Sequence, residues 1–300
     1  MHKNSDVLIS SVEGNRQRLD GGAMFGNAPR ALWERWTSPD QQGRILLACR
    51  ALLIEAYGKT LLCETGIGAF FEPKLAERFG VEDPQSHKLL ENLDALGLGE
   101  EDIDYVILSH LHFDHAGGLL PTYQEIQQGK DRLLFPKAQY LVGQEAWERA
   151  THPHSRDRAS FIPGLRDKLK ESGRLSLIQG GRAPQGLLPT ELHERLEFIY
   201  SQGHTPGQMH SLFHGTERSV FYAGDLIPGT HWVHLPITMG YDRFPEQLID
   251  EKAQIYQRAL KEKWLVFYTH DDLYAASGLQ QMDGRFQPVE TQKTLKRFLL

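Results

Sequence analysis

Short apolar runs separated by glycine and polar turns dominate the first half of the chain. Residues 44–65 read R-I-L-L-A-C-R-A-L-L-I-E-A-Y-G-K-T-L-L-C-E-T, which predicts two strands joined at a Tyr57-Gly58-Lys59 turn. Residues 85–98 carry apolar side chains at helical spacing and end among glycines, which predicts a helix. The apolar run at 103–109 predicts a further strand that leads directly into the segment S-H-L-H-F-D-H-A-G-G.

The second half continues this alternation of strands and helices. Further strands are expected at the short apolar runs 139–142, 175–178, 196–200, 209–213, 219–223 and 265–268. Helices are expected where apolar residues recur at helical spacing, at 144–150, 165–172, 245–262 and 289–299. Two batches of strands, each followed by helices, indicate an α/β protein with mixed sheets whose outer faces are covered. Because no linker or break in composition interrupts the chain, a single domain over residues 1–300 is expected, with 271–300 as a terminal helix.

Composition and charge exclude several classes of protein. Hydrophobic residues make up 40% of the chain and charged residues 24%, which is typical of a globular protein and not of a disordered or fibrous one. The net charge of −6 gives no general attraction for nucleic acid. No apolar run reaches the length of a membrane span or of a signal peptide, so we expect a cytoplasmic protein without a membrane anchor. The two cysteines, Cys49 and Cys63, are expected to be buried thiols.

The segment from Ser109 to Gly118 places three histidines and one aspartate within six residues. Burying such groups without partners would cost roughly 1–3 kcal/mol each, so they are either solvated or share a ligand. In an extended segment, His110 and His112 point together at one metal, while Asp114 and His115 turn towards a second. Imidazole and carboxylate ligands suit zinc, and iron or manganese almost as well.

One cluster supplies too few ligands for two metals, and three other segments can supply the rest. Each follows a predicted strand and lies in a turn that contains glycine or polar residues: Q-G-H-T-P-G-Q with His204, F-Y-A-G-D-L-I-P-G with Asp225, and L-V-F-Y-T-H-D-D with His270. Each short motif alone is a weak predictor of a metal site. Their joint occurrence is a strong signal.

Together these motifs resemble those of the metallo-beta-lactamase superfamily in its binuclear branch. The signature H-x-H-x-D-H is complete, and the later histidine, aspartate and last histidine follow in the order typical of the superfamily. The resemblance implies a four-layer αββα sandwich with two mixed β-sheets and two divalent metal ions, either zinc or the alternatives iron and manganese. The implied metal ligands are His110, His112, Asp114, His115, His204, Asp225 and His270.

The resemblance also divides these ligands between the two metals. His110, His112 and His204 would hold the first metal. Asp114, His115 and His270 would hold the second, and an aspartate, Asp225, would bridge both. A metal-bridging hydroxide, formed because the metals lower the pKa of water from about 15.7 towards neutrality, would then attack a carbonyl or phosphoryl group. Asp114 is the candidate catalytic residue that orients the water or shuttles its proton.

The substrate is inferred from apolar residues in glycine-rich turns. Met24, Phe25, Phe70, Phe71 and Trp232 are expected to line the substrate pocket, with residues 1–43 forming a loop beside it. The segment D-G-G-A-M-F-G and the histidine cluster resemble the lactonase and organophosphate-hydrolase side of the superfamily, including the N-acyl-homoserine lactone lactonases. We therefore expect a small-molecule ester or lactone with an apolar acyl group as substrate. Apolar surface on the N-terminal segment is compatible with a homodimer.

One departure from the lactonase pattern bears on the mechanism. Lactonases usually carry a tyrosine three positions after the bridging aspartate, whereas this chain has Pro228. The candidates for its role are Tyr222, Tyr241, Tyr274 and His231. Glu64, at the end of the second strand, is expected to support a ligating histidine.

Two alternative functions remain open from the sequence. A thioester hydrolase similar to glyoxalase II would use the same metal centre, but it calls for basic residues that hold the glutathione carboxylates. A non-catalytic metal-binding or ligand-binding relative would fit the missing tyrosine. RNA-processing nucleases are disfavoured by the acidic chain, a β-lactamase by the missing export signal, and mononuclear iron dioxygenases by the complete set of seven ligands.

Overall fold

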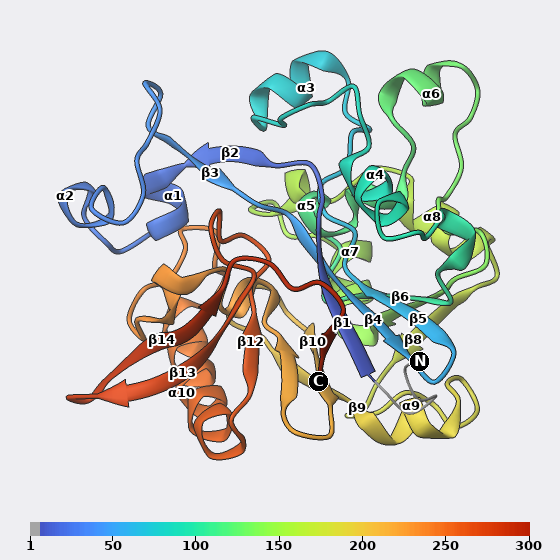
Figure 1. The fold of residues 1–300 in the computed structure, drawn as a ribbon. Helices are drawn as coiled ribbons and strands as arrows, with labels where there is room; N and C mark the ends of the chain where they lie inside the picture. The colour runs from blue at the N-terminus through green and yellow to red at the C-terminus, as the bar shows by residue number, and fades with distance from the viewer. Residues whose placement is uncertain (1–6) are drawn as a thin grey trace.

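The computed structural model describes residues 7–300, which form two facing sheets with helices on their outer sides (Figure 1). Residues 1–6 of the expected N-terminal segment 1–43 lie outside the described residues. The rest of that segment is not a loop, because it contains β1 (Val7–Glu13), β2 (Gln17–Asp20), α1 (Gly21–Phe25) and α2 (Arg30–Trp33).

The first sheet has seven strands in the order β15-β1-β4-β5-β6-β7-β8. Its other members are β4 (Arg50–Ala56), β5 (Lys59–Cys63), β6 (Tyr105–Leu108), β7 (Gln139–Gly143), β8 (Leu175–Ile178) and β15 (Phe298–Leu299). Strands β5 to β8 are parallel, whereas β1, β4 and β5 pair antiparallel. The predicted turn between β4 and β5 is confirmed, with positive φ at Tyr57 and Gly58, as a tight hairpin requires.

The second sheet has six strands in the order β14-β13-β12-β11-β10-β9. They are β9 (Leu196–Ser201), β10 (Gln208–His214), β11 (Ser219–Tyr222), β12 (Leu265–Phe267), β13 (Ala276–Met282) and β14 (Arg285–Gln292). Only β11 and β12 pair in parallel, so this sheet is mixed as well. A small third sheet pairs β2 with β3 (Arg44–Leu47).

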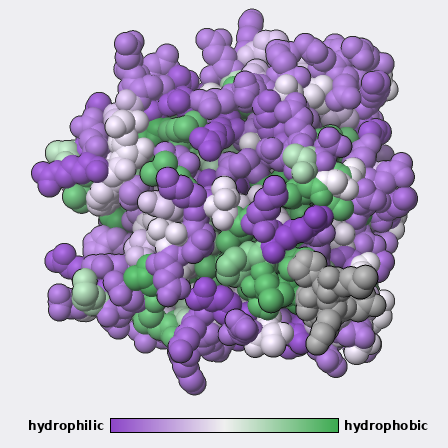
Figure 2. Space-filling view, in the orientation of Figure 1, coloured by the Kyte–Doolittle hydropathy of each residue, from purple (hydrophilic) through white to green (hydrophobic). Residues whose placement is uncertain are grey.

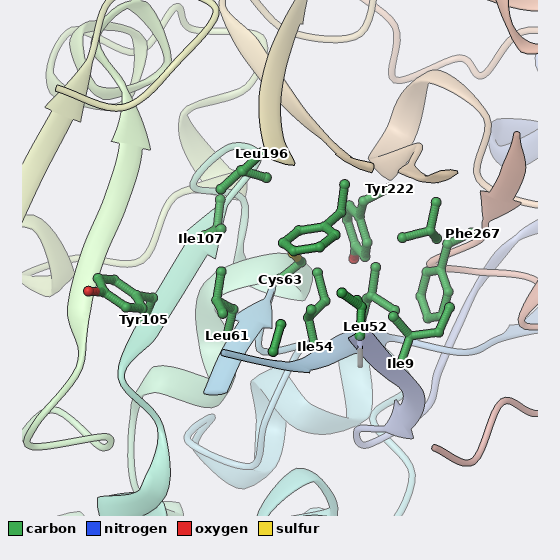
Figure 3. Close-up of a cluster of buried hydrophobic side chains, with 14 of the residues drawn as sticks. Ile9, Leu52, Ile54, Leu61, Cys63, Tyr105, Ile107, Leu196, Tyr222 and Phe267 are labelled. Atoms are coloured by element: carbon green, nitrogen blue, oxygen red, sulfur yellow. The ribbon is translucent and has the colours of Figure 1, made fainter. Parts of the chain in front are cut away.

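The main core lies between the inner faces of the two large sheets. Figure 3 shows Leu52, Ile54 and Leu61 of the first sheet opposite Tyr222 and Phe267 of the second. Neighbouring residues of β4 point the other way and pack under the helices, so this strand is apolar on both faces. Burying each large apolar side chain contributes roughly 1.5–3 kcal/mol.

Helices form the two outer layers. The first sheet is covered by α4 (Lys88–Asp94), α7 (Gln144–Thr151) and α8 (Leu165–Glu171), and the second by α10 (Pro245–Glu262). This arrangement confirms the predicted αββα sandwich. The remaining α-helices are short connections: α3 (Pro73–Arg78), α5 (Phe113–Ala116), α6 (Tyr123–Gln127) and α9 (Thr190–Arg195).

The predicted terminal helix at 289–299, within 271–300, is wrong. The chain there forms β13 and β14, joined at Asp283 and Gly284, which both have positive φ and make the turn that Asp-Gly pairs favour in hairpins. Leu295 and Leu300 then enter the core between the sheets, and β15 pairs with β1. The apolar residues at 289–299 are spaced as in a helix, but the pairing of β15 with β1 determines the conformation of this segment.

Polar side chains dominate the face shown in Figure 2, where apolar residues form separate groups among them. Across residues 7–300, none of the helices combines the length and apolar character that crossing a bilayer requires.

Candidate metal centre

The seven predicted ligands lie beyond the carboxyl ends of strands in both large sheets. The cluster from His110 to His115 follows β6, His204 follows β9, Asp225 follows β11 and His270 follows β12. Strands β9, β11 and β12 run in the same direction, so their carboxyl ends meet at one edge of the second sheet. Such edges are common places for ligand sites in α/β proteins.

The cluster is extended only at its start. His112 is the N-cap of the one-turn helix α5, which carries Asp114 and His115. The next residues, Gly117 and Gly118, lie so close to the loop at 65–67 that a Cβ would come within 2.1 Å of the Ile67 carbonyl oxygen and 2.0 Å of that of Thr65. Glycine is therefore required at both positions, and this close packing fixes the helix turn.

Three imidazoles form the first group. The candidate ligand atoms of His110, His112 and His204 all lie within 4.8 Å of one another. Nε2 of His204 is 3.4 Å from Nδ1 of His112. These nitrogens converge on one point from two different sheets.

The second group contains Asp114, His115 and His270, whose candidate ligand atoms also lie within 4.8 Å of one another. Asp225 connects the two groups. Its Oδ1 is 3.2 Å from Nε2 of His115 and 3.1 Å from Nε2 of His270. Its Oδ2 is 3.2 Å from Nε2 of His204. One carboxylate thus faces both groups.

Buried atoms without partners test whether this centre fits metal ions. Within residues 7–300, Nε2 of His110 and Nε2 of His112 are buried and have no hydrogen-bond partner. Leaving such atoms unsatisfied costs about 1–3 kcal/mol each. Imidazole nitrogens and carboxylate oxygens around a shared centre are the donor set that zinc and similar divalent ions accept. The residues present therefore fit such ions.

Other residues hold the far side of three of the imidazoles. Nδ1 of His204 is 2.9 Å from Oδ1 of Asp242, and Nδ1 of His270 is 2.7 Å from the Ala48 carbonyl oxygen. Nδ1 of His115 is 3.2 Å from Oε2 of Glu64, as expected for a supporting acid. Such contacts orient the ring so that its Nε2 faces the centre.

Two further contacts involve residues outside the predicted set. Oγ of Ser109 lies 2.9 Å from Nδ1 of His110, and Gln17 Nε2 donates to Oδ2 of Asp114 at 2.9 Å. The sequence offered no signal for Gln17 or for Asp242, because both come from segments far from their partners along the chain.

Burial and charge set the protonation of these groups. Burial lowers the pKa of His110 well below its usual value and that of His112 to about 3, so both imidazoles are neutral at pH 7. Burial opposes ionisation of Asp225, but the facing imidazoles of His115, His204 and His270 outweigh it and hold its pKa well below the usual range. Burial lowers the pKa of His115, His204 and His270, but the Asp225 charge outweighs it and raises all three, so these imidazoles must lose a proton when a metal binds. Neutral imidazole and ionised carboxylate are the forms that bind metals.

A cavity of about 370 Å³ opens onto this centre. Its floor includes His112, Asp114, His204, Asp225 and His270. Its apolar wall consists of Leu19, Met24, Phe79, Phe113 and Met239. The volume and this apolar wall suit a small organic molecule.

Only Met24 of the five predicted pocket residues lines the cavity. Phe25 and Trp232 stack on each other at 4.6 Å behind it, and Trp232 Nε1 donates to the Met24 carbonyl oxygen. Phe70 and Phe71 pack together at 4.1 Å, and Phe71 lies behind Phe79 and Phe113. The glycine turns direct these four aromatic side chains inward, where they support the wall rather than form it.

Among the candidates for the missing tyrosine, only Tyr241 lines this cavity, and it is 44% exposed. The Tyr222 hydroxyl lies in the core between the sheets and donates to the Arg50 carbonyl oxygen. His231 stacks on Trp36. Tyr274 is not among the residues that line the cavity.

Comparisons with known proteins agree with this fold and site. The sequence profile described as the metallo-beta-lactamase superfamily matches residues 44–270. The N-acyl homoserine lactonase of Bacillus thuringiensis is 26% identical over 208 residues, which cover 68% of this chain and 68% of that protein.

Solved structures extend the similarity to the whole chain. A probable metal-dependent hydrolase from Staphylococcus aureus superimposes with a TM-score of 0.83 at 26% identity, and the alignment covers 100% of both chains. The dizinc quorum-quenching lactonase AidC, in complex with a product described as an N-acylated L-homoserine, superimposes with a TM-score of 0.70 at 18% identity. That alignment covers 96% of this chain and 95% of AidC, and at this identity it shows a shared fold.

Proposed function

The chain belongs to the metallo-beta-lactamase superfamily and is a hydrolase of that superfamily, and we propose that it opens a lactone or cleaves an ester with an apolar acyl group. The observation that carries this proposal is a cavity with an apolar wall, whose floor is formed by five of the seven proposed His and Asp ligands. The names of the relatives support it, because they describe lactonases and a metal-dependent hydrolase.

We propose that the centre holds two divalent metal ions, with zinc as the first candidate and iron or manganese as alternatives. His110, His112 and His204 would hold one ion. Asp114, His115 and His270 would hold the other, and Asp225 would contact both. Bound there, such ions would supply a nucleophilic hydroxide at neutral pH and polarise the substrate carbonyl.

The protein's own groups position the substrate and move protons. Asp114 lies in the floor of the cavity with its side chain 13% exposed, and Gln17 fixes its Oδ2. Burial opposes ionisation of Asp114, but the charges of His115 and His270 outweigh it and lower the pKa, so the side chain is ionised at neutral pH and can accept a hydrogen bond from the attacking water and orient it. The apolar wall would hold the acyl chain and exclude water from it.

Tyr241 would take the place of the lactonase tyrosine. This residue lines the cavity, and burial, followed by the charge of Asp114, raises the pKa of the phenol. The phenol therefore stays protonated at neutral pH. It can donate a hydrogen bond to the substrate carbonyl or to the leaving oxygen.

Metal analysis combined with substrate turnover tests the proposal. The purified protein should contain two metal ions per chain and hydrolyse members of a panel of lactones and aryl esters, and a chelator should abolish turnover. Asp225→Ala should lose both metal and activity, whereas Asp250→Ala, at an exposed position on α10, should keep both.

The same panel addresses the two alternatives. A thioester that is turned over faster than any lactone or ester would move the reaction to thioester hydrolysis. Full metal content with no turnover of any class would favour a ligand-binding relative. A cytoplasmic location and a homodimer stay predictions.

A further inference from the structure

Two arginines, Arg156 and Arg243, lie at the mouth of the metal cavity. Arg156 lines the 370 Å³ cavity, and it also lines an adjoining outer groove of about 580 Å³ together with Arg243. Met239 and Gly240 line both spaces, so the groove continues from the cavity. Among residues 7–300, neither guanidinium has a carboxylate within 4.0 Å, although the neighbouring Arg149 is paired with Asp157.

The Arg243 guanidinium is the less satisfied of the two. Its Nε and Nη1 are buried, and no hydrogen-bond partner for them exists in the part of the chain that the structure describes. Burial lowers the pKa of Arg243, the Asp157 charge opposes this shift, and Arg149 and Arg156 add to it. Two buried N–H groups without a partner on a half-buried guanidinium are costly, which calls for an explanation.

The neighbouring acid does not neutralise these charges. Arg149 donates two hydrogen bonds to Oδ2 of Asp157, from Nε at 2.9 Å and from Nη2 at 2.6 Å. Oδ1 of Asp157 is buried and unpaired, yet it lies beyond ion-pair distance of Arg243. Three guanidinium groups thus lie around one buried carboxylate, which among residues 7–300 pairs with Arg149. Asp242 and the exposed Glu246 also line the groove, but the oxygens of Asp242 contact His204 and Met239, and Glu246 forms no ion pair within residues 7–300. Arg156 and Arg243 are therefore left without a carboxylate partner in the described part of the chain.

Both arginines are fixed to the backbone that surrounds the metal centre. Arg156 Nη2 donates to the Gly240 carbonyl oxygen at 2.7 Å. The backbone N–H of Arg243 donates to the carbonyl oxygen of His204, a proposed ligand, at 3.2 Å. The Arg156 guanidinium and the backbone of Arg243 are therefore held at defined positions relative to the reacting centre.

We propose that Arg156 and Arg243 form a subsite for a carboxylate group at the far end of the acyl chain of the substrate. This inference rests on the proposed function and narrows its substrate class to esters or lactones whose apolar chain ends in an acid. The apolar wall would contact the chain, and the planar guanidinium groups match a carboxylate through paired hydrogen bonds. Asp157 and Glu246 nearby favour a singly charged group over a phosphate dianion.

Matched ester substrates test the subsite on the metal-loaded enzyme. One series of para-nitrophenyl esters has an acyl chain that ends in a carboxylate, and the other ends in an uncharged isopropyl group of the same shape. Chain length is varied in one-carbon steps. The wild-type enzyme should prefer the acid at one length, and that preference should weaken as salt is added.

Arginine variants assign the preference to these residues. Arg156→Met and Arg243→Met should each raise KM for the acidic ester about tenfold or more while kcat/KM for the neutral ester stays unchanged. Arg243→Lys should retain part of the preference, because it keeps the charge but loses the planar fork. Arg158→Met, at an exposed arginine that lines a different groove, should behave as wild type.

The outcomes separate this inference from the proposed function. Equal hydrolysis of both series by the wild type and all variants would remove the subsite but leave the hydrolase intact. An enzyme inactive on both series and on the panel of lactones would defeat the proposed function, and calorimetric titration with glutarate would then decide the subsite. Weaker glutarate binding in Arg243→Met supports it, and unchanged binding overturns it.

Discussion

Asp242 connects the metal centre to the wall of the cavity. Its Oδ1 is 2.9 Å from Nδ1 of His204, and its Oδ2 accepts the backbone N–H of Met239 at 2.6 Å. A single buried carboxylate therefore orients a proposed ligand and also fixes the loop that carries Met239 and Tyr241. The geometry of the centre and the shape of the cavity are not independent in this molecule.

Loss of this carboxylate should weaken metal binding. In Asp242→Ala, the His204 ring loses its orienting partner, and we expect metal affinity to fall about 10- to 100-fold. Competition with a fluorescent chelator measures this affinity. Asp250→Ala provides the control, since that exposed aspartate is remote from the ligands in sequence. Equal affinity in both variants would contradict the orienting role.

Tyr241→Phe should lower kcat and leave metal content intact. The phenol lines the cavity but is not a proposed ligand, so its loss removes one hydrogen bond to the substrate. A hydrogen bond of about 1.4 kcal/mol in the transition state corresponds to about a tenfold lower kcat. Steady-state kinetics on the best ester or lactone measures the effect. Tyr274→Phe, at a tyrosine that does not line the cavity, should be unaffected.

Most of the fold could be predicted because its strands are short apolar runs between clear turn signals. The parallel strands β6 and β7 are nearly continuous runs of large apolar residues, as expected for strands buried on both faces. The C-terminal segment could not be predicted in this way, because pairing of β15 with β1 joins residues almost 300 positions apart. Local spacing contains no information about such pairing.

The candidate site shows the same limit. The motifs identified the seven proposed ligands, and the structure brings them together, although their metal role stays a prediction. Most of the supporting contacts could not be predicted from the sequence; Gln17 and Asp114, for example, are 97 positions apart. The direction in which the aromatic side chains of the glycine-containing turns point could not be predicted either. Phe25 stacks on Trp232 behind the wall because the tertiary fold, and not the sequence around it, provides that neighbour.

Removal of metal should destabilise the protein. Without bound ions, the buried carboxylate of Asp225 and the imidazoles around it lose the partners that offset their burial. If the ions are present at about a hundred times their Kd, their loss costs about 2.7 kcal/mol, which corresponds to a Tm lower by about 5 °C or more. Differential scanning calorimetry with and without chelator measures the shift. The Tm of Asp225→Ala should change little when the chelator is added. A wild-type Tm that is the same with and without chelator would count against a metal centre.

Lys252 should make the stability of the protein depend on pH. This fully buried lysine of α10 donates to the carbonyl oxygens of His234, Leu235 and Ile237 at 3.3, 3.1 and 2.9 Å, and so anchors the loop that leads to Asp242. Burial lowers its pKa to about 7. Between that value and the pKa of about 10.4 in the unfolded chain, the unfolded state holds more protons, so stability rises with pH in this window.

A variant without the amine isolates this effect. Relative to Lys252→Met, the wild type should gain about 1.4 kcal/mol of unfolding free energy per pH unit between about pH 8 and 9. Urea denaturation at several pH values measures the difference, and the other titrating groups cancel in the comparison. Lys261→Met, at an exposed position on the same helix, should show no such slope. A difference between wild type and Lys252→Met that does not change with pH would mean that Lys252 keeps its proton throughout, held by its three carbonyl partners.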